Sequence, residues 1–174
     1  MIVIEEPPAP AAALAEVKAY LRIGHDGEDA LLAGLIGAAG EACEAFTRRA
    51  LMVRELIETL PGTGAWTRLG AAPVMAITAV AAGDVPLAPG DYAVDIDSAG
   101  EGWVRLLRPI EAGRVSVAYR AGMAADPGRL PEALRHGIVR LAAHLYTIRD
   151  GGGPREPPAA VTALWRPWRR LRLG

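Results

Sequence analysis

The sequence predicts an α+β fold: a helical core with an inserted antiparallel β-sheet and a hinged C-terminal arm. Three observations carry this prediction. Apolar residues recur at helical spacing near both ends of the chain, whereas the middle reads as short strands separated by turns. A glycine run at 151–154 then precedes a short last segment. With 174 residues, the chain suits one domain with an appendage, which we place at 1–150 and 151–174.

We expect three helices, at about 11–22, 27–49 and 131–149. The first follows a proline-rich N-terminal arm, and Gly24 marks the break after it. Asp26 and Asp29 resemble a capping box at the start of the second helix, with the Asp26 side chain accepting from an amide three residues on. The third helix begins at Pro131 and has the most regular apolar stripe, formed by Leu134, Ile138, Leu141, Leu145 and Ile148.

Three glycines recur every three residues within the second helix, at Gly34, Gly37 and Gly40. Each costs roughly 1 kcal/mol of helix stability relative to alanine. A phosphate-binding loop would need them before the helix rather than inside it. We therefore interpret them as a face that another helix approaches closely, and as a candidate surface for packing between subunits.

The inserted β region runs from about 52 to 120. Residues 91–97 alternate, with Tyr92, Val94 and Ile96 on one face and three aspartates on the other. Val115, Val117 and Tyr119 alternate in the same way. The aspartates do not form a calcium loop, because Leu106 stands where such a loop starting at Asp95 needs a glutamate.

The residue content argues against catalysis. Cys43 is the only cysteine, so an intrachain disulfide is impossible. His136 and His144 are eight residues apart and do not make the i, i+4 pair that favours a metal. No serine lies in a Gly-x-Ser-x-Gly turn. We predict no enzyme, no cofactor, no metal site and no transmembrane helix.

The charge is nearly balanced, with a net charge of −1, but it is unevenly distributed. All basic residues except Lys18 are arginines, a bias that a GC-rich genome explains. Residues 155–174 contain five arginines against one glutamate, together with two tryptophans. This segment could contact nucleic-acid phosphates, lie on a membrane surface, dock on a protein partner or simply pack on its own domain, and we favour the protein partner. The candidate docking residues are Val161, Leu164, Trp165, Arg166, Trp168, Arg169, Arg170, Leu171 and Arg172.

An ordered series of short motifs extends over nearly the whole chain. It comprises VKAYLRI at 17–23, Asp26 and Asp29, TRRAL at 47–51, DYAVD at 91–95, VAYRAG at 117–122, LPEALRH at 130–136 and LYTIR at 145–149. This series resembles the head-tail connector (adaptor) proteins of tailed phages and phage-like gene transfer agents. Met123 departs from the pattern, because an aromatic residue is expected there.

The resemblance implies a structural protein of the particle neck, made in the bacterial cytoplasm. It implies a ring of identical subunits, commonly twelve, that binds the portal, presents a platform to the next tail component and extends the channel for double-stranded DNA. It also implies that the C-terminal segment binds the portal. The alternative is a nucleic-acid-binding protein that uses the Arg/Trp-rich C-terminal segment. No membrane contact is expected.

Overall fold

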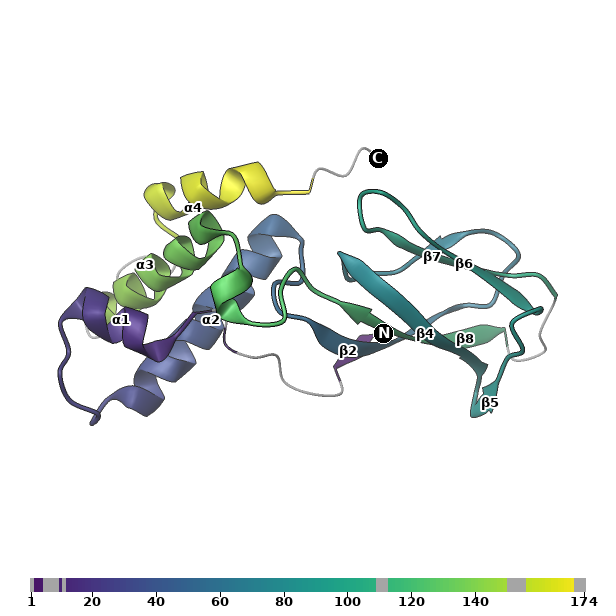
Figure 1. Cartoon of the computed structure of the whole chain (residues 1–174), viewed down its shortest axis with the longest axis horizontal. Helices are drawn as coiled ribbons and strands as arrows, with labels where there is room; N and C mark the ends of the chain where they lie inside the picture. Colours follow the sequence, from purple (N-terminus) through teal and green to yellow (C-terminus); the bar gives the residue numbers. More distant parts are fainter. Residues whose placement is uncertain (1, 5–9, 11, 109–112, 150–155, 171–174) are drawn as a thin grey trace. The chain divides into compact units, whose positions relative to one another are not determined.

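The computed structural model describes residues 2–4, 10, 12–108, 113–149 and 156–170. The predicted hinge at 151–154 and two candidate docking residues, Leu171 and Arg172, lie outside this part of the chain. The structure is α+β, as predicted, and it divides into two compact units (Figure 1). The helical unit comprises 9–52 and 124–174, and the β unit comprises 1–8 and 53–123.

Within its described residues, the helical unit contains four α-helices: α1 (Leu14–Leu21), α2 (Asp29–Thr47), α3 (Glu132–Ile148) and α4 (Ala159–Trp165). Two 3-10 turns, η1 (Pro127–Arg129) and η2 (Arg166–Trp168), precede α3 and follow α4. Helix α3 packs against all three other helices. The predicted apolar stripes form the core, because Leu32, Ile36, Leu134, Ile138 and Leu141 are all buried.

The start of α2 differs from the prediction. Asp26 does not cap the helix, and the residue before α2, Glu28, makes no side-chain capping hydrogen bond. Instead, the Lys18 ammonium lies 2.6 Å from the Asp26 carboxylate and 2.7 Å from that of Asp29. The two aspartates therefore tie α1 to the beginning of α2. The hydrogen bond to Lys18, and then its charge, lower the pKa of Asp26.

Both N-terminal helices end at an arginine in the left-handed conformation. Arg22 has φ of 59° and follows α1, so the helix ends before Gly24, where we expected the break. Arg48 has φ of 56° and follows α2. Glycine is the usual residue at this position because a side chain disfavours positive φ.

The described part of the β unit forms two antiparallel sheets. The larger sheet has the order β1-β2-β8-β4-β5 and the smaller has the order β3-β7-β6. The strands are β1 (Ile2–Ile4), β2 (Arg54–Pro61), β3 (Thr67–Arg68), β4 (Val74–Ala82), β5 (Val85–Pro86), β6 (Tyr92–Ile96), β7 (Gly102–Leu106) and β8 (Arg114–Ala121). One core draws residues from both sheets, among them Leu56, Val80, Val104 and Tyr119.

The predicted alternation is confirmed in β8, where Val115, Val117 and Tyr119 are buried. In β6, Val94 lies opposite the buried Val104, but Val94 itself is 43% exposed. Strand β6 is the edge of its sheet, so its side chains have a neighbouring strand, β7, on one side only.

A buried polar pair lies within the β unit. The Tyr119 hydroxyl donates to the Glu58 carboxylate at 3.0 Å, and the Gly70 N–H donates to the same oxygen at 2.8 Å. Glu58 is only 8% exposed. Burial, and then the Glu58 charge, raise the pKa of Tyr119. The carboxylate thus joins β2, β8 and the loop after β3.

Candidate docking surfaces

The C-terminal segment belongs to the helical unit rather than to a separate arm. Trp165 is fully buried, and its indole N–H donates to the Leu134 carbonyl oxygen at 3.3 Å. Its ring lies 5.9 Å from that of Phe46. Gly137 makes room for it, because a Cβ at that position would lie 2.2 Å from the indole nitrogen. Val161 is also buried. These two predicted docking residues therefore hold α4 against its own unit and are not exposed to a partner.

The residues after α4 contact the carboxyl end of α2. The Arg170 N–H donates to the Thr47 carbonyl at 2.9 Å, and its guanidinium donates to the Arg48 carbonyl at 3.2 Å. The Arg49 side chain donates to the Trp168 carbonyl at 2.9 Å. A helix end exposes unpaired carbonyls and a partial negative charge, so arginines are stabilising there.

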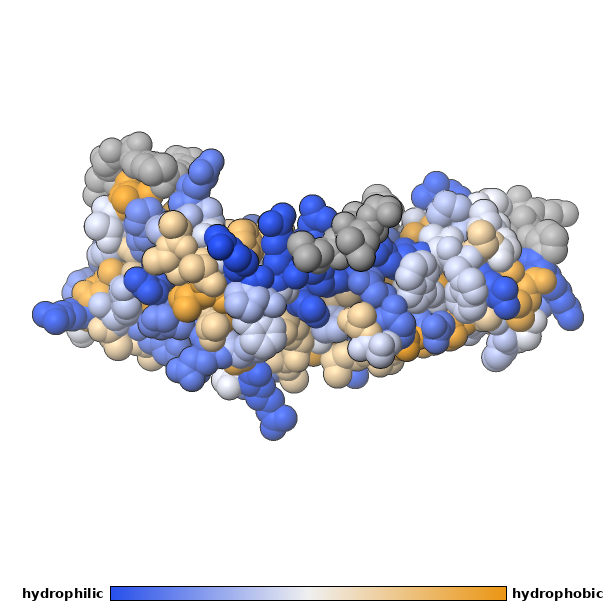
Figure 2. Space-filling view, turned by 90° about the horizontal axis from the view of Figure 1, so that it is seen from above, coloured by the Kyte–Doolittle hydropathy of each residue, from blue (hydrophilic) through white to orange (hydrophobic). Residues whose placement is uncertain are grey.

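The remaining predicted docking residues in this segment lie at least partly on the surface. Arg166 and Arg169 are exposed, whereas Leu164, Trp168 and Arg170 are half-buried. The Arg169 guanidinium lies 5.6 Å from the Phe46 ring centroid. In the face shown in Figure 2, hydrophilic and apolar side chains are interspersed. The available surface in this segment is therefore a mixed Arg/Trp/Leu surface.

The three glycines of α2 do not share one face. Gly40 is buried, whereas Gly34 and Gly37 are exposed. A Cβ at Gly34 or Gly37 would meet no atom within 4 Å. Within the described residues, no helix approaches the backbone at these two positions, contrary to the expected close approach within the chain. Because Gly40 is buried, the prediction of packing between subunits remains only for Gly34 and Gly37.

By length and composition, α2 is apolar enough to cross a membrane, a test that the core helix of a soluble protein also passes. Its inward side chains, including Leu32, Ile36 and Cys43, are fully buried within the helical unit. Burial raises the pKa of the Cys43 thiol. On this side α2 is a core helix, whereas residues on its opposite side, among them Leu31 and Ala38, are exposed.

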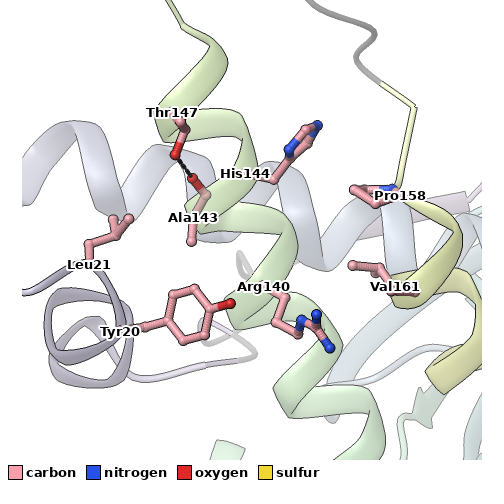
Figure 3. A pocket seen from close by; sticks show the side chains of 9 residues that line it. Tyr20, Leu21, Arg140, Ala143, His144, Thr147, Pro158 and Val161 are labelled. Carbon is pink, nitrogen blue, oxygen red and sulfur yellow. Dashed lines mark hydrogen bonds between the residues drawn. The ribbon is translucent and has the colours of Figure 1, made fainter.

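A cavity of about 270 Å³ opens among α1, α3 and the start of α4 (Figure 3). Tyr20 and Leu21 line it from α1, and Arg140 and His144 line it from α3. The hydroxyl of Thr147, another lining residue, donates to a backbone carbonyl of its own helix. The cavity offers a cation and an imidazole but no nucleophile paired with a base, and the sequence did not predict it. No group of metal-binding side chains exists among the described residues.

Residues 11–77 match the family model described as "Phage gp6-like head-tail connector protein". This segment runs from before α1 into β4. No curated protein sequence matches the chain.

Solved structures extend the likeness to nearly the full length. A chain from the neck of an empty gene transfer agent (GTA) particle, computed with C6 symmetry, is 29% identical, with a TM-score of 0.81 and coverage of 99% of this chain and 97% of that one. Chains from a native GTA virion and from a native GTA neck, computed with C12 symmetry, have the same identity and coverage and TM-scores of 0.79 and 0.75. The predicted resemblance to head-tail connector proteins is confirmed by both comparisons.

Proposed function

We propose that this chain is a structural adaptor in the neck of a tailed phage or gene transfer agent particle, where it forms a ring between the portal and the tail. The likeness to chains of GTA necks, over 99% of the sequence at 29% identity, carries this proposal. The C12 symmetry of one of those necks agrees with twelve copies. The ring passes double-stranded DNA and presents a platform to the downstream tail component. The role involves no chemical step.

The test is deletion of the gene in the producing bacterium, with complementation. The expected result is DNA-filled heads without tails by electron microscopy, restored by the wild-type gene. Particles with normal necks in the deletion strain would refute the adaptor role. Imaging of wild-type necks should also show density for this chain as a ring on the portal.

The C-terminal segment is the proposed portal-binding surface. Its exposed part consists of Arg166 and Arg169 with the half-buried Leu164, Trp168 and Arg170, and it continues into Leu171 and Arg172. Arginine and tryptophan are favoured anchors in protein interfaces. Val161 and Trp165 take a different role here, because they fix α4 on the helical unit so that the residues after it are held in place.

A charge reversal tests this surface better than a deletion, because removing 155–174 also removes Trp165 from the core. The double variant Arg166→Glu/Arg169→Glu should bind purified portal at least about tenfold more weakly, the effect of about 1.4 kcal/mol. Arg114→Glu, an exposed charge reversal in the β unit, is the control for a charge reversal outside this surface. Equal portal binding by both variants would refute the assignment.

The nucleic-acid-binding alternative gains no support from the comparisons. Its main feature was the arginine cluster, and Arg170 is engaged with backbone carbonyls of its own unit. Tight, salt-dependent DNA binding by the isolated chain that is lost in Arg166→Glu/Arg169→Glu would support this alternative instead of the adaptor role.

A further inference from the structure

The outward side of α2 is almost free of charge. Its exposed residues are Ala30, Leu31, Ala33, Gly34, Gly37, Ala38, Glu41 and Ala45. Glu41 is the one charged side chain among them, and Leu31 is 42% exposed. A surface helix normally carries charged and polar residues on its outer side, whereas a helix that is apolar all round is buried on all sides. The inward side of α2 is already buried in the core. Its outward side has the composition of a second buried face, which is typical of a helix that packs against neighbours on both sides.

Among the described residues, none packs closely against the glycines on this side. Gly34 and Gly37 lie inside a regular helix, where glycine lowers helix stability. Neither position has a positive φ, and a Cβ at either would meet no atom within 4 Å. The fold of one chain therefore does not require glycine here. These glycines would have a role if the backbone of another protein chain packed closely against them.

The occupant that the findings favour is a second copy of this chain. Similar chains occupy necks computed with C6 and C12 symmetry, with coverage of 99% of this chain. In a rotationally symmetric ring, each copy contacts two identical neighbours through two different surfaces.

We infer that the outward side of α2, from Ala30 to Ala45, is a surface through which each copy packs against the next copy in the ring. This inference rests on the proposed adaptor ring and adds which helix joins its subunits. It predicts that Gly34 and Gly37 lie against the backbone of the neighbour, and that a charge placed at Ala38 is buried without a partner.

The test compares Ala38→Glu with Ala15→Glu in the particle-producing strain. Both alanines are exposed and lie on helices of the same unit, so the two changes are chemically matched. Ala38→Glu should reduce the number of neck-bearing particles by about tenfold or more, because an unpaired charge in an interface is costly. Ala15→Glu should leave the number unchanged. Circular dichroism of both purified variants checks that they fold.

A second variant separates assembly from folding. Gly34→Ala/Gly37→Ala should raise the Tm of the isolated chain by a few degrees, because alanine favours the helix. It should nevertheless reduce ring formation, because two methyl groups hold the neighbour's backbone away. A raised Tm with undiminished necks would overturn the inference.

Photo-crosslinking identifies the occupant directly. A photoreactive amino acid at position 38, in assembled particles, should give covalent dimers of this chain. Crosslinks only to another protein, or partition of the wild-type chain onto phospholipid vesicles that Ala38→Glu abolishes, would overturn the inference. If wild-type necks contain this chain and Ala38→Glu necks form normally, this inference alone fails. If wild-type necks lack the chain, the proposed adaptor function fails.

Discussion

Replacement of Trp165 by alanine tests whether the C-terminal segment is part of the core. Trp165 is fully buried, its N–H is bonded to the Leu134 carbonyl, and its ring adjoins Phe46. Substitution of a buried tryptophan by alanine typically costs about 3–5 kcal/mol. For a chain of this size, that corresponds to a Tm lower by roughly 6–20 °C. We expect Trp165→Ala to lose this much, measured by thermal and urea unfolding followed by circular dichroism.

A double-mutant cycle makes the test specific. Gly137→Ala places a Cβ where it would lie 2.2 Å from the indole nitrogen, and overpacking of this kind costs about 1–3 kcal/mol. In the Trp165→Ala background the same change should cost nothing, since the clashing ring is gone. The half-buried Trp168 serves as a control, and Trp168→Ala should cost clearly less than Trp165→Ala. A loss below about 1 kcal/mol for Trp165→Ala, or additive effects in the cycle, would refute the packing argument.

Three further outcomes follow from other contacts. Glu58→Ala should lower the free energy of unfolding in urea by about 1–3 kcal/mol, because the buried Tyr119 hydroxyl loses its acceptor; an unchanged value would contradict this. Lys18→Met should lower the Tm at neutral pH. Lys18 lowers the pKa of Asp26 from 3.8, so this part of the stabilisation is present above about pH 3.8 and is lost as the pH falls through the folded-state pKa. The Tm difference between wild type and variant should therefore shrink below pH 3.8, and a constant difference would count against the pairing. The Cys43 thiol, with its raised pKa, should react with a thiol reagent only as fast as the helical unit opens, and rapid reaction in the native state would disprove its burial.

The sequence predicted the local elements because their patterns are local. Strand β8 alternates in the chain as it does in the sheet, and its alternate residues from Val115 to Tyr119 are buried. The stripe from Leu134 to Leu141 predicted α3 for the same reason, since side chains three or four residues apart share a helix face. An ordered series of short motifs was sufficient to indicate the connector class.

The sequence did not predict which surfaces meet. Asp26 and Asp29 resemble a helix cap in the sequence, but two carboxylates can equally pair with a nearby lysine. The packing of α1 brings Lys18 to them, so they form ion pairs instead of a cap. Trp165 has the composition of an interface anchor, and nothing near it in the chain indicates that Gly137 leaves a space for its ring. Likewise, the regular spacing of the α2 glycines did not indicate that Gly40 is buried whereas Gly34 and Gly37 are exposed.

The sequence by itself predicted the three helices before the C-terminal segment, the β region, the α+β class and the resemblance to connector proteins, because periodicity and motif order depend on neighbours along the chain. The tertiary structure alone decided that the C-terminal helix completes the helical unit and that the outward side of α2 is left uncovered. Both depend on side chains that meet across long separations in sequence: Trp165 lies on Leu134 and Gly137, and Arg170 lies on the end of α2. The burial of Trp165 and the exposure of the outward side of α2 both follow from how the helices pack, and no local sequence pattern predicts that packing.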